Sequence, residues 1–340
     1  MLKVRSLSVF LLVPLMALSF LSVTAQEPER LTVYSGRNEA LIAPLIAQFT
    51  AETGIEIDTL YGDTAAVANQ ILEEGTNSPA DVYIGQDAGA LGALAKAGLM
   101  RALPSDILER VPKQFKSPDG LWVGISGRAR VLVYNPQKIE ELGLELPTSI
   151  LDLTRPEYKG LVGWAPANAS FQSNVTALRV LQGDEAAAQW LADMVTNETI
   201  SFGSSNGNLN AAVASGEIVM GITNHYYMFG LLAETPDAPI AQHFFPAGDP
   251  GALINVAGTG VLTTSDQPGL SQRFILYLLG HDAQQYFVDK TFEYPVIADI
   301  PAHEKVTPLA DIQSPVLDLS NLDDLQTTLA LIEDSGALDE

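Results

Sequence analysis

Strand-like and helix-like segments alternate along almost the whole chain, and no other feature limits its possible folds so strongly. A buried strand pattern at residues 31 to 36 is followed by a helical pattern that ends at Gly54. The strand pattern "IEIDTLYG" is followed by a helical pattern that stops at Gly75, and "DVYIG" is followed by "GALGALAKAG". Strands that alternate with helices of about ten to fifteen residues predict parallel sheets whose strands are connected by helices.

The alternation continues in the second half of the chain. There, "WVGISGRARVLVYN" is a strand-like stretch long enough to pass between two lobes. Later strand patterns are "LVGWAP", "EIVMGITN" and "GTGVLTTS", and helical patterns occur at residues 171 to 181 and in "EAAAQWLADMV", "NLNAAVASG" and "LSQRFILYLLG". Ligands of such folds bind beyond the carboxyl ends of parallel strands. The segments "VYSGRNE", "YIGQDAG", "WAPANASF" and "ITNHYY" each follow a strand, so we expect them to form one site.

Residues 1 to 25 have the pattern of a cleaved secretory signal peptide. Lys3 and Arg5 precede an apolar run from about residue 7 to residue 23, and the small residues at 23 to 25 suit a cleavage site. The chain contains no cysteine, so it can carry no lipid at that site, no disulfide and no thiolate ligand. We therefore expect a periplasmic protein with no stable membrane insertion.

The charge balance argues against several partners. The chain carries 18 basic and 41 acidic residues, which gives a formal net charge of −23. So acidic a surface repels nucleic acid and anionic membranes and is compatible with a cationic ligand, although a surface that only keeps the protein soluble would have the same composition. The length of 340 residues is sufficient for two lobes.

The signatures of common enzymes are missing from the sequence. It has no HExxH pair, no GxSxG elbow, no Walker loop and no GxGxxG fingerprint, and its four histidines are scattered. Paired carboxylates such as Glu73/Glu74 and Asp323/Asp324 lie in helical patterns, where solvated faces are the rule. A glycosidase-like pair stays open, because its spacing is set in three dimensions. We do not expect an enzyme.

Two adjacent tyrosines, Tyr226 and Tyr227, stand at a predicted corner between a strand and a helix. The strand ends at Asn224 and "YYMFGLL" opens the helix, so both phenols can turn into one cleft. An ionised phenol is a hard oxygen donor, which suits a small, highly charged cation such as ferric iron, whereas softer metals prefer thiolate or imidazole. Alternatively, the two tyrosines only pack, with their hydroxyls bonded to backbone.

Eight segments, taken in order, resemble those of the periplasmic ferric-iron-binding proteins of bacterial ABC importers, a branch of the type II periplasmic binding proteins that is similar to transferrin lobes. They are "VYSGRNEALI", "TGIEI", "GTNSPADVYIGQDAG", "SPDGLWVGISGRARVLVYN", "GWAPANASFQ", "ASGEIVMGITNHYY", "GDPGALINVAGTGVL" and "EYPV". The resemblance implies an α/β fold of two lobes, each a mainly parallel sheet flanked by helices, joined by crossing hinge strands near residues 122 to 134 and 252 to 260. The first lobe would comprise residues 27 to 127 and 258 to 307, and the second lobe residues 128 to 257 and 308 to 340.

The resemblance implies that Tyr226 and Tyr227 are ferric ligands, but two other family ligands are replaced in this sequence. The position at which the family usually has a histidine falls near Asn38, and Glu39 follows it. A carboxylate of certain members falls on Gln86, and Asp87 follows it. Amides are weak neutral ligands, so the tyrosine pair would need help from Glu39, Asp87, water or a bound anion.

One branch of the family holds a phosphate with a turn and two asparagines. Its residues fall on Asn168, Ala169, Ser170, Asn206 and Asn224. Backbone amides at the start of the helix that follows such a turn suit an anion. Carbonate is the other anion that the resemblance allows.

Two family-shared arginines, Arg128 and Arg130, alternate with Ala129 and so point to one side of a strand. One guanidinium could hold the anion through two parallel hydrogen bonds. Alternatively, one of the two arginines forms an interlobe salt bridge.

The resemblance implies a function as well as a fold. The protein would be a monomer that captures ferric iron between its lobes and delivers it to an inner-membrane ABC permease driven by an ATPase. The alternative is a binding protein of the same fold for another small ligand, such as thiamine, a polyamine or a phosphorylated compound.

Overall fold

The computed structural model describes residues 29 to 338, and the predicted signal peptide lies outside this range. The strands are β1 (Arg30–Ser35), β2 (Glu56–Tyr61), β3 (Val82–Gly85), β4 (Val123–Tyr134), β5 (Val162–Trp164), β6 (Ile200–Ser201), β7 (Met220–Asn224), β8 (Ala241–His243) and β9 (Ile254–Val261). They form one sheet in the order β2-β1-β3-β9-β4-β7-β5-β6, with β8 paired to β4. No helix within the described range is long and apolar enough to cross a membrane.

Helices connect most of the strands, as the sequence predicts. The longer ones are α1 (Glu39–Thr53), α2 (Thr64–Glu74), α3 (Ala88–Lys96), α6 (Ala169–Gln182), α7 (Asp184–Thr196), α8 (Asn206–Ser215), α9 (Tyr226–Glu234), α10 (Pro268–Leu278), α11 (His281–Thr291) and α12 (Leu325–Asp334). Shorter ones are α4 (Ser105–Leu108) and α5 (Pro136–Leu142). Several helices end as predicted at a glycine: Gly54, for example, follows α1 with a left-handed φ of 73°, a conformation that glycine adopts without strain.

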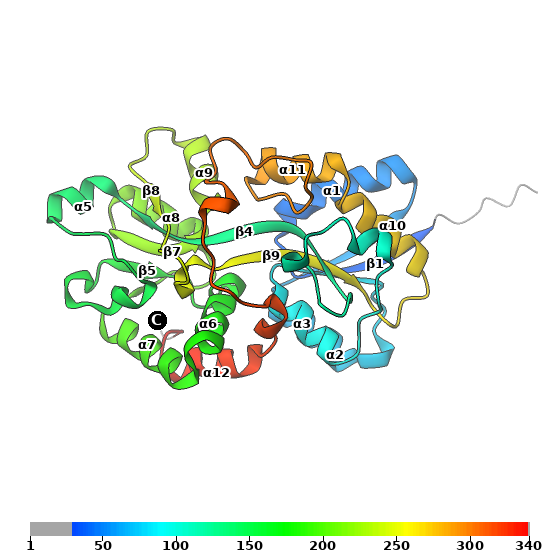
Figure 1. Ribbon diagram of the computed structural model, residues 1–340, viewed down its shortest axis with the longest axis horizontal. Coiled ribbons are helices and arrows are strands. Elements are labelled where there is room, and N and C mark those ends of the chain that lie inside the picture. The colour runs from blue at the N-terminus through cyan, green and yellow to red at the C-terminus, as the bar shows by residue number, and fades with distance from the viewer. Residues whose placement is uncertain (1–28, 339–340) are drawn as a thin grey trace, which may run out of the picture.

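Two long strands join the two sides of the molecule. Figure 1 shows β4 and β9 running through the middle, with α1, α2, α3 and α10 on one side and α7, α8 and α9 on the other. β4 and β9 are antiparallel to each other, and each is antiparallel to its other neighbours. The pairings β1–β2, β1–β3, β5–β6 and β5–β7 are parallel. The sheet is therefore mixed, because the two crossing strands run against the strands of both sides.

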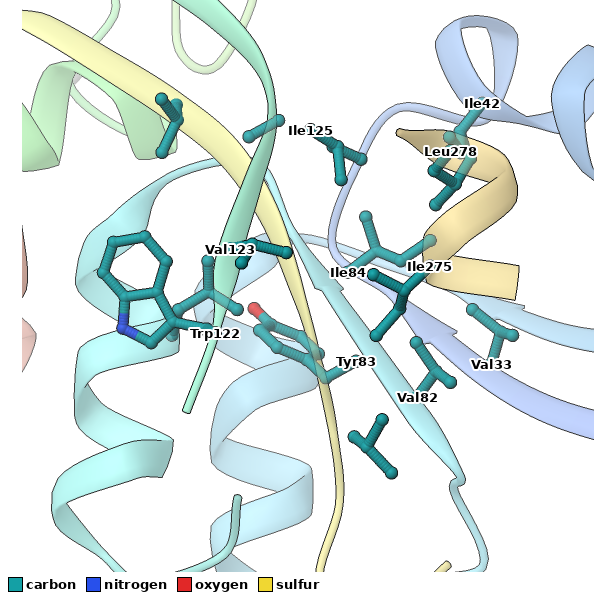
Figure 2. Packing of buried hydrophobic residues seen from close by; sticks show 14 of the residues in the cluster. Val33, Ile42, Val82, Tyr83, Ile84, Trp122, Val123, Ile125, Ile275 and Leu278 are labelled. Carbon is teal, nitrogen blue, oxygen red and sulfur yellow. The ribbon is translucent and has the colours of Figure 1, made fainter. Parts of the chain in front are cut away.

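Each side has its own apolar core. The larger cluster lies around β1, β3 and α10, and Figure 2 shows Val33, Tyr83 and Ile275 among its members. A second cluster includes Trp164, Phe171 and Trp190, and a third contains residues of β4, α8 and α9. The apolar packing is therefore divided between the two sides, and the residue bounds of two lobes stay a prediction.

The last 30 residues of the described chain touch both sides. Leu319 and Leu322 belong to the larger core, whereas Ile332 and Ala337 belong to the second core. Figure 1 shows this segment descending across β4 and β9 before α12 lies under α6. The predicted assignment of residues 308 to 340 to the second lobe thus describes only part of this segment's packing.

Candidate metal and anion site

The four segments that follow strands β1, β3, β5 and β7 meet at one cavity, as the sequence predicts. The cavity has a volume of about 390 Å³. The turn before α2, at residues 62 to 66, also contributes to its wall. Of the predicted site residues, the cavity is lined by Asn38, Gln86, Asn168, Ala169, Ser170, Tyr226 and Tyr227. Polar side chains from both sides of the molecule therefore converge on one cavity.

The tyrosine pair stands at the corner between β7 and α9. β7 ends at Asn224 and α9 begins at Tyr226, and the two phenol rings lie 4.6 Å apart between centroids. Tyr226 is buried and Tyr227 is half-buried. The Tyr226 hydroxyl accepts hydrogen bonds from Asn224 Nδ2 over 3.2 Å and Gln86 Nε2 over 3.4 Å. Its partners are therefore side chains, in contrast to the alternative in which it bonds to backbone.

The surroundings of Tyr226 oppose ionisation unless a cation is present. Burial raises the pKa of Tyr226 well above its ordinary value, and the charge that Tyr227 would carry raises it further. The nearby guanidinium groups of Arg128 and Arg37 act in the opposite direction. Two N–H donors already point at the phenol oxygen, so the site can stabilise a phenolate once a metal has displaced the proton.

Gln86 is turned so that its N–H group, and not its oxygen, faces the tyrosine. Its Oε1 accepts a hydrogen bond from Arg37 Nη1 over 3.5 Å. The neighbouring Asp87 is buried but does not line the cavity. Its Oδ1 caps α3 by accepting from the amides of Gly89 and Ala90, over 3.0 and 3.4 Å. The structure thus does not present either predicted ligand oxygen to the tyrosine pair.

Asn38 and Glu39 stand at the start of α1. Asn38 lines the cavity, and its Oδ1 caps the helix by accepting from the amide of Ala40 over 2.9 Å. Glu39 is exposed and does not line the cavity. Capping explains both positions, because asparagine before a helix and a carboxylate in its first turn stabilise the helix start.

Arg128 and Arg130 lie on β4, and both are buried. Arg128 Nε donates to Ser170 Oγ over 3.2 Å, and Arg130 Nη1 donates to Asn224 Oδ1 over 2.9 Å. Both Nη atoms of Arg128, and Nε and Nη2 of Arg130, have no partner within residues 29 to 338. Burial lowers the pKa of Arg130 to about 9, and the nearby charge of Arg128 adds to this shift. The predicted alternative, an interlobe salt bridge, is not formed by either arginine in this part of the chain.

The predicted anion turn lies beside these arginines. Asn168 caps α6 by accepting from the amide of Ser170 over 3.0 Å, and Ala169 is the first residue of that helix. Ser170 Oγ also accepts from Asn224 Nδ2 over 3.1 Å. Asn206 is buried but does not line the cavity, and neither carboxamide atom has a partner among the described residues. A helix start and two guanidinium groups suit an anion.

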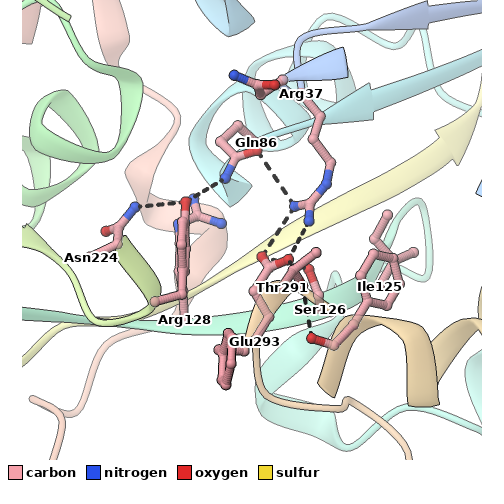
Figure 3. Close-up of polar contacts among 12 residues, drawn as sticks. Arg37, Gln86, Ile125, Ser126, Arg128, Asn224, Thr291 and Glu293 are labelled. Atoms are coloured by element: carbon pink, nitrogen blue, oxygen red, sulfur yellow. Dashed lines mark hydrogen bonds and ion pairs between the residues drawn. The ribbon is translucent and has the colours of Figure 1, made fainter. Parts of the chain in front are cut away.

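A buried ion pair that no sequence motif predicts adjoins the site. Arg37 donates from Nη1 to Glu293 Oε1 over 3.2 Å, and its Nη2 forms a second contact with Oε2. Ser126 and Thr291 also donate to the carboxylate of Glu293, over 3.0 and 2.8 Å. Figure 3 shows these contacts and the link from Arg37 through Gln86 toward Asn224. No local motif pairs these positions, so the sequence alone offered no signal.

The described residues contain no group of three or more histidine, cysteine, aspartate or glutamate side chains that could hold a metal. The cavity lining includes three side chains that can supply an anionic oxygen, namely the phenols of Tyr226 and Tyr227 and the carboxylate of Asp63. Such oxygen donors fit a hard cation.

The fold and this cavity define a class: a two-lobed α/β binding protein with its ligand site between the lobes. The family model described as "bacterial extracellular solute-binding protein" matches residues 34 to 285, and the chain belongs to this family. Its members are transport components, so the expectation that the protein is not an enzyme is confirmed.

Individual relatives confirm the resemblance found in the sequence. The chain is 33% identical to the Fe(3+)-binding periplasmic protein of Serratia marcescens over 341 residues, covering 99% of each chain. It is 30% identical to the major ferric iron-binding protein of Neisseria meningitidis, covering 94% of this chain and 97% of that protein. The structure of iron-bound HitA from Pseudomonas aeruginosa matches with a TM-score of 0.85 and 34% identity, covering 91% of this chain and 100% of that chain.

Proposed function

We propose that this protein captures ferric iron with the phenolates of Tyr226 and Tyr227, together with an anion held by Arg128 and Arg130. The observation that carries the proposal is the placement of both phenols in one cavity, beside two buried guanidinium groups with unpartnered N–H donors. The names of the relatives from Serratia and Neisseria, which bind ferric iron, support the choice of metal.

A bound anion would neutralise buried positive charge in the site. Two buried arginines without carboxylate partners destabilise the fold. An anion between them would accept hydrogen bonds from the N–H groups that have no partner. Ferric iron bound by two phenolates keeps one positive charge and open coordination positions, so the same anion can complete the coordination. Phosphate and carbonate both meet these requirements.

Metal binding would be coupled to the arrangement of the lobes and to pH. Gln86 and Tyr226 come from different sides of the molecule, so an ion enclosed between them favours the closed form. Because burial raises the pKa of Tyr226, protons compete strongly for its oxygen, and acid should release iron steeply.

A cellular role follows from the proposed capture of ferric iron. We infer that the protein is exported to the periplasm by the predicted signal peptide and works there as a monomer. It would deliver iron to an ABC permease and its ATPase. Purified permease in proteoliposomes checks this step, because the iron-loaded protein should stimulate ATP hydrolysis more than the metal-free protein does.

A visible absorption spectrum tests the ferric assignment. Adding ferric citrate to desalted protein should produce a tyrosinate-to-iron charge-transfer band, and the Tyr226→Phe/Tyr227→Phe variant should lack it. Tyr134→Phe, which removes a half-buried phenol outside the cavity, serves as the matched control. Absence of the band in the wild type would refute ferric binding by phenolates, and a band that survives in the double variant would refute the residue assignment.

A further inference from the structure

One side chain reaches across the cavity from the first side of the molecule to the tyrosine pair. Gln86 follows β3, and its Nε2 donates to the hydroxyl of Tyr226, which opens α9. The distance is 3.4 Å, and the two residues are 140 positions apart in the sequence. Because β3 and α9 belong to different sides, this hydrogen bond exists only while the sides are close together.

A buried ion pair fixes the direction in which Gln86 points. Arg37 donates to Oε1 of Gln86, and a guanidinium has donors but no acceptor. The carboxamide oxygen must therefore face Arg37, which leaves the amide nitrogen to face Tyr226. Arg37 is itself held by Glu293, and neither side chain of that pair is exposed. Figure 3 shows Gln86 between Arg37 and Asn224.

We propose that Gln86 is an interlobe latch, oriented by the Arg37–Glu293 pair, which favours the closed form before metal binds and keeps a hydrogen bond on the Tyr226 oxygen afterwards. Only the second half of this statement rests on the proposed function. The first half concerns the metal-free protein alone.

The chemistry of an amide explains why glutamine suits this position. A carboxylate at residue 86 would face Arg37, whose charge Glu293 already neutralises, and would offer no N–H group to Tyr226. It would also place a negative charge beside a developing phenolate. A carboxamide accepts from Arg37 and donates to Tyr226 at the same time, with no added charge.

The distance between the sides in the metal-free protein tests the latch. The chain has no cysteine, so Glu73→Cys on α2 and Ala192→Cys on α7, both at exposed positions, would supply the only thiols for two spin labels. Electron–electron distance measurements should show a larger open population in Gln86→Leu. One neutral hydrogen bond corresponds to about a fivefold fall in the closed-to-open ratio.

The chain offers a closely matched control. Gln70 Nε2 also donates to a tyrosine hydroxyl, that of Tyr34, over the same distance of 3.4 Å, but both residues belong to the first side. Gln70→Leu should therefore leave the interlobe distance unchanged. Unchanged distances in Gln86→Leu, or an equal shift in Gln70→Leu, would overturn the latch.

The iron-loaded protein gives a second readout that a purely structural role would not alter. A hydrogen bond to a phenolate oxygen lowers the energy of its donor electrons, so its loss should move the charge-transfer band of Gln86→Leu to longer wavelength. Gln70→Leu should keep the wild-type wavelength, and an unmoved band in Gln86→Leu would overturn the second half of the proposal. A wild type without any band would refute ferric binding instead, whereas the distance measurement would still decide the latch.

Discussion

Arg37 and Glu293 lie 256 positions apart in the sequence and form an ion pair in which neither side chain is exposed to solvent. Burial acts to raise the pKa of Glu293, but the charge and hydrogen bonds of Arg37, with smaller effects of Thr291 and Arg128, together outweigh it, and the pKa lies below its ordinary value. Hydrogen bonds from Ser126 and Thr291 occupy the carboxylate further. The pair joins the loop after β1 to the loop after α11, and so supports one wall of the cavity.

Removing one partner of this pair should destabilise the protein much more than removing both partners. Glu293→Gln leaves the Arg37 charge buried without a partner, so we expect the free energy of unfolding to fall by roughly 3–5 kcal/mol. Arg37→Met/Glu293→Leu removes both charges and should lose much less. Urea unfolding followed by circular dichroism measures both, and Lys138→Ala, which breaks the exposed pair with Glu141, should cost less than about 1 kcal/mol. A double variant less stable than Glu293→Gln would contradict this account.

His225, next to the tyrosine pair, has a structural role in this fold. It is fully buried, its Nδ1 accepts from the amide of Ala129 over 3.2 Å, and its Nε2 donates to the carbonyl of Phe292 over 2.8 Å. The imidazole is therefore neutral with a defined tautomer, and it stacks on Tyr294 with centroids 4.6 Å apart. Burial lowers the pKa of His225 to about 4, although its backbone partners and Glu293 act in the opposite direction.

Acid should therefore destabilise the metal-free protein partly through His225. Below the ordinary pKa of 6.5, the unfolded chain binds a proton that the native imidazole does not bind until about pH 4. The contribution of the neutral His225 to the free energy of unfolding is therefore fully present above pH 6.5. It falls by up to roughly 3 kcal/mol as the pH drops to 4. His225→Gln lacks this titration, so its unfolding free energy should depend less on pH over this interval. Parallel profiles for the two proteins in urea titrations would refute this assignment.

The sequence predicted the parts of the site that depend on local patterns. Asn168, Ser170 and the tyrosine pair each come shortly after a strand, and they line one cavity because strand ends at one sheet edge meet. The predicted corner between residues 224 and 226 is confirmed, because β7 ends and α9 begins there. The strand predicted at residues 258 to 265 was placed four residues too late, because β9 runs from Ile254 to Val261.

Other parts of the site could not be read from local patterns. The Arg37–Glu293 pair joins distant positions, and no periodicity or motif connects them. Asp87 and Glu39 were predicted as candidate ligands, but the structure places them at helix starts and not in the cavity lining. The sequence did contain the competing signal, since aspartate before a helix is a preferred cap. The orientation of Gln86 depends on Arg37 and so required the three-dimensional structure.

An anion should stabilise the metal-free protein through the unpartnered donors of Arg128. We expect phosphate at one hundred times its dissociation constant to raise the free energy of unfolding by about 2.7 kcal/mol. Arg128→Gln should lose most of this increase, whereas Arg110→Gln, at an exposed position away from the cavity, should retain it. Thermal unfolding at constant ionic strength, with chloride in place of phosphate, measures the difference. A phosphate effect that is the same in all three proteins would show that it arises outside this site.

The close packing of the C-terminal segment against α3 should make Gly89 intolerant of a side chain. A Cβ at Gly89 would lie 2.4 Å from the carbonyl oxygen of Leu322, which is backbone and cannot turn away. Gly89→Ala must therefore displace the segment around Leu322, and overpacking of this kind lowers the free energy of unfolding by roughly 1–3 kcal/mol. Gly230→Ala, in the interior of α9 with nothing within 4 Å of the new Cβ, should instead raise the free energy of unfolding by about 0.5–1 kcal/mol.

Hydrogen exchange should show where Gly89→Ala destabilises the protein. The amide of Asn321 donates to the carbonyl of Asp318 over 3.0 Å, and it should exchange faster only in Gly89→Ala. Unchanged exchange in this segment would show that it does not bear on α3 in solution.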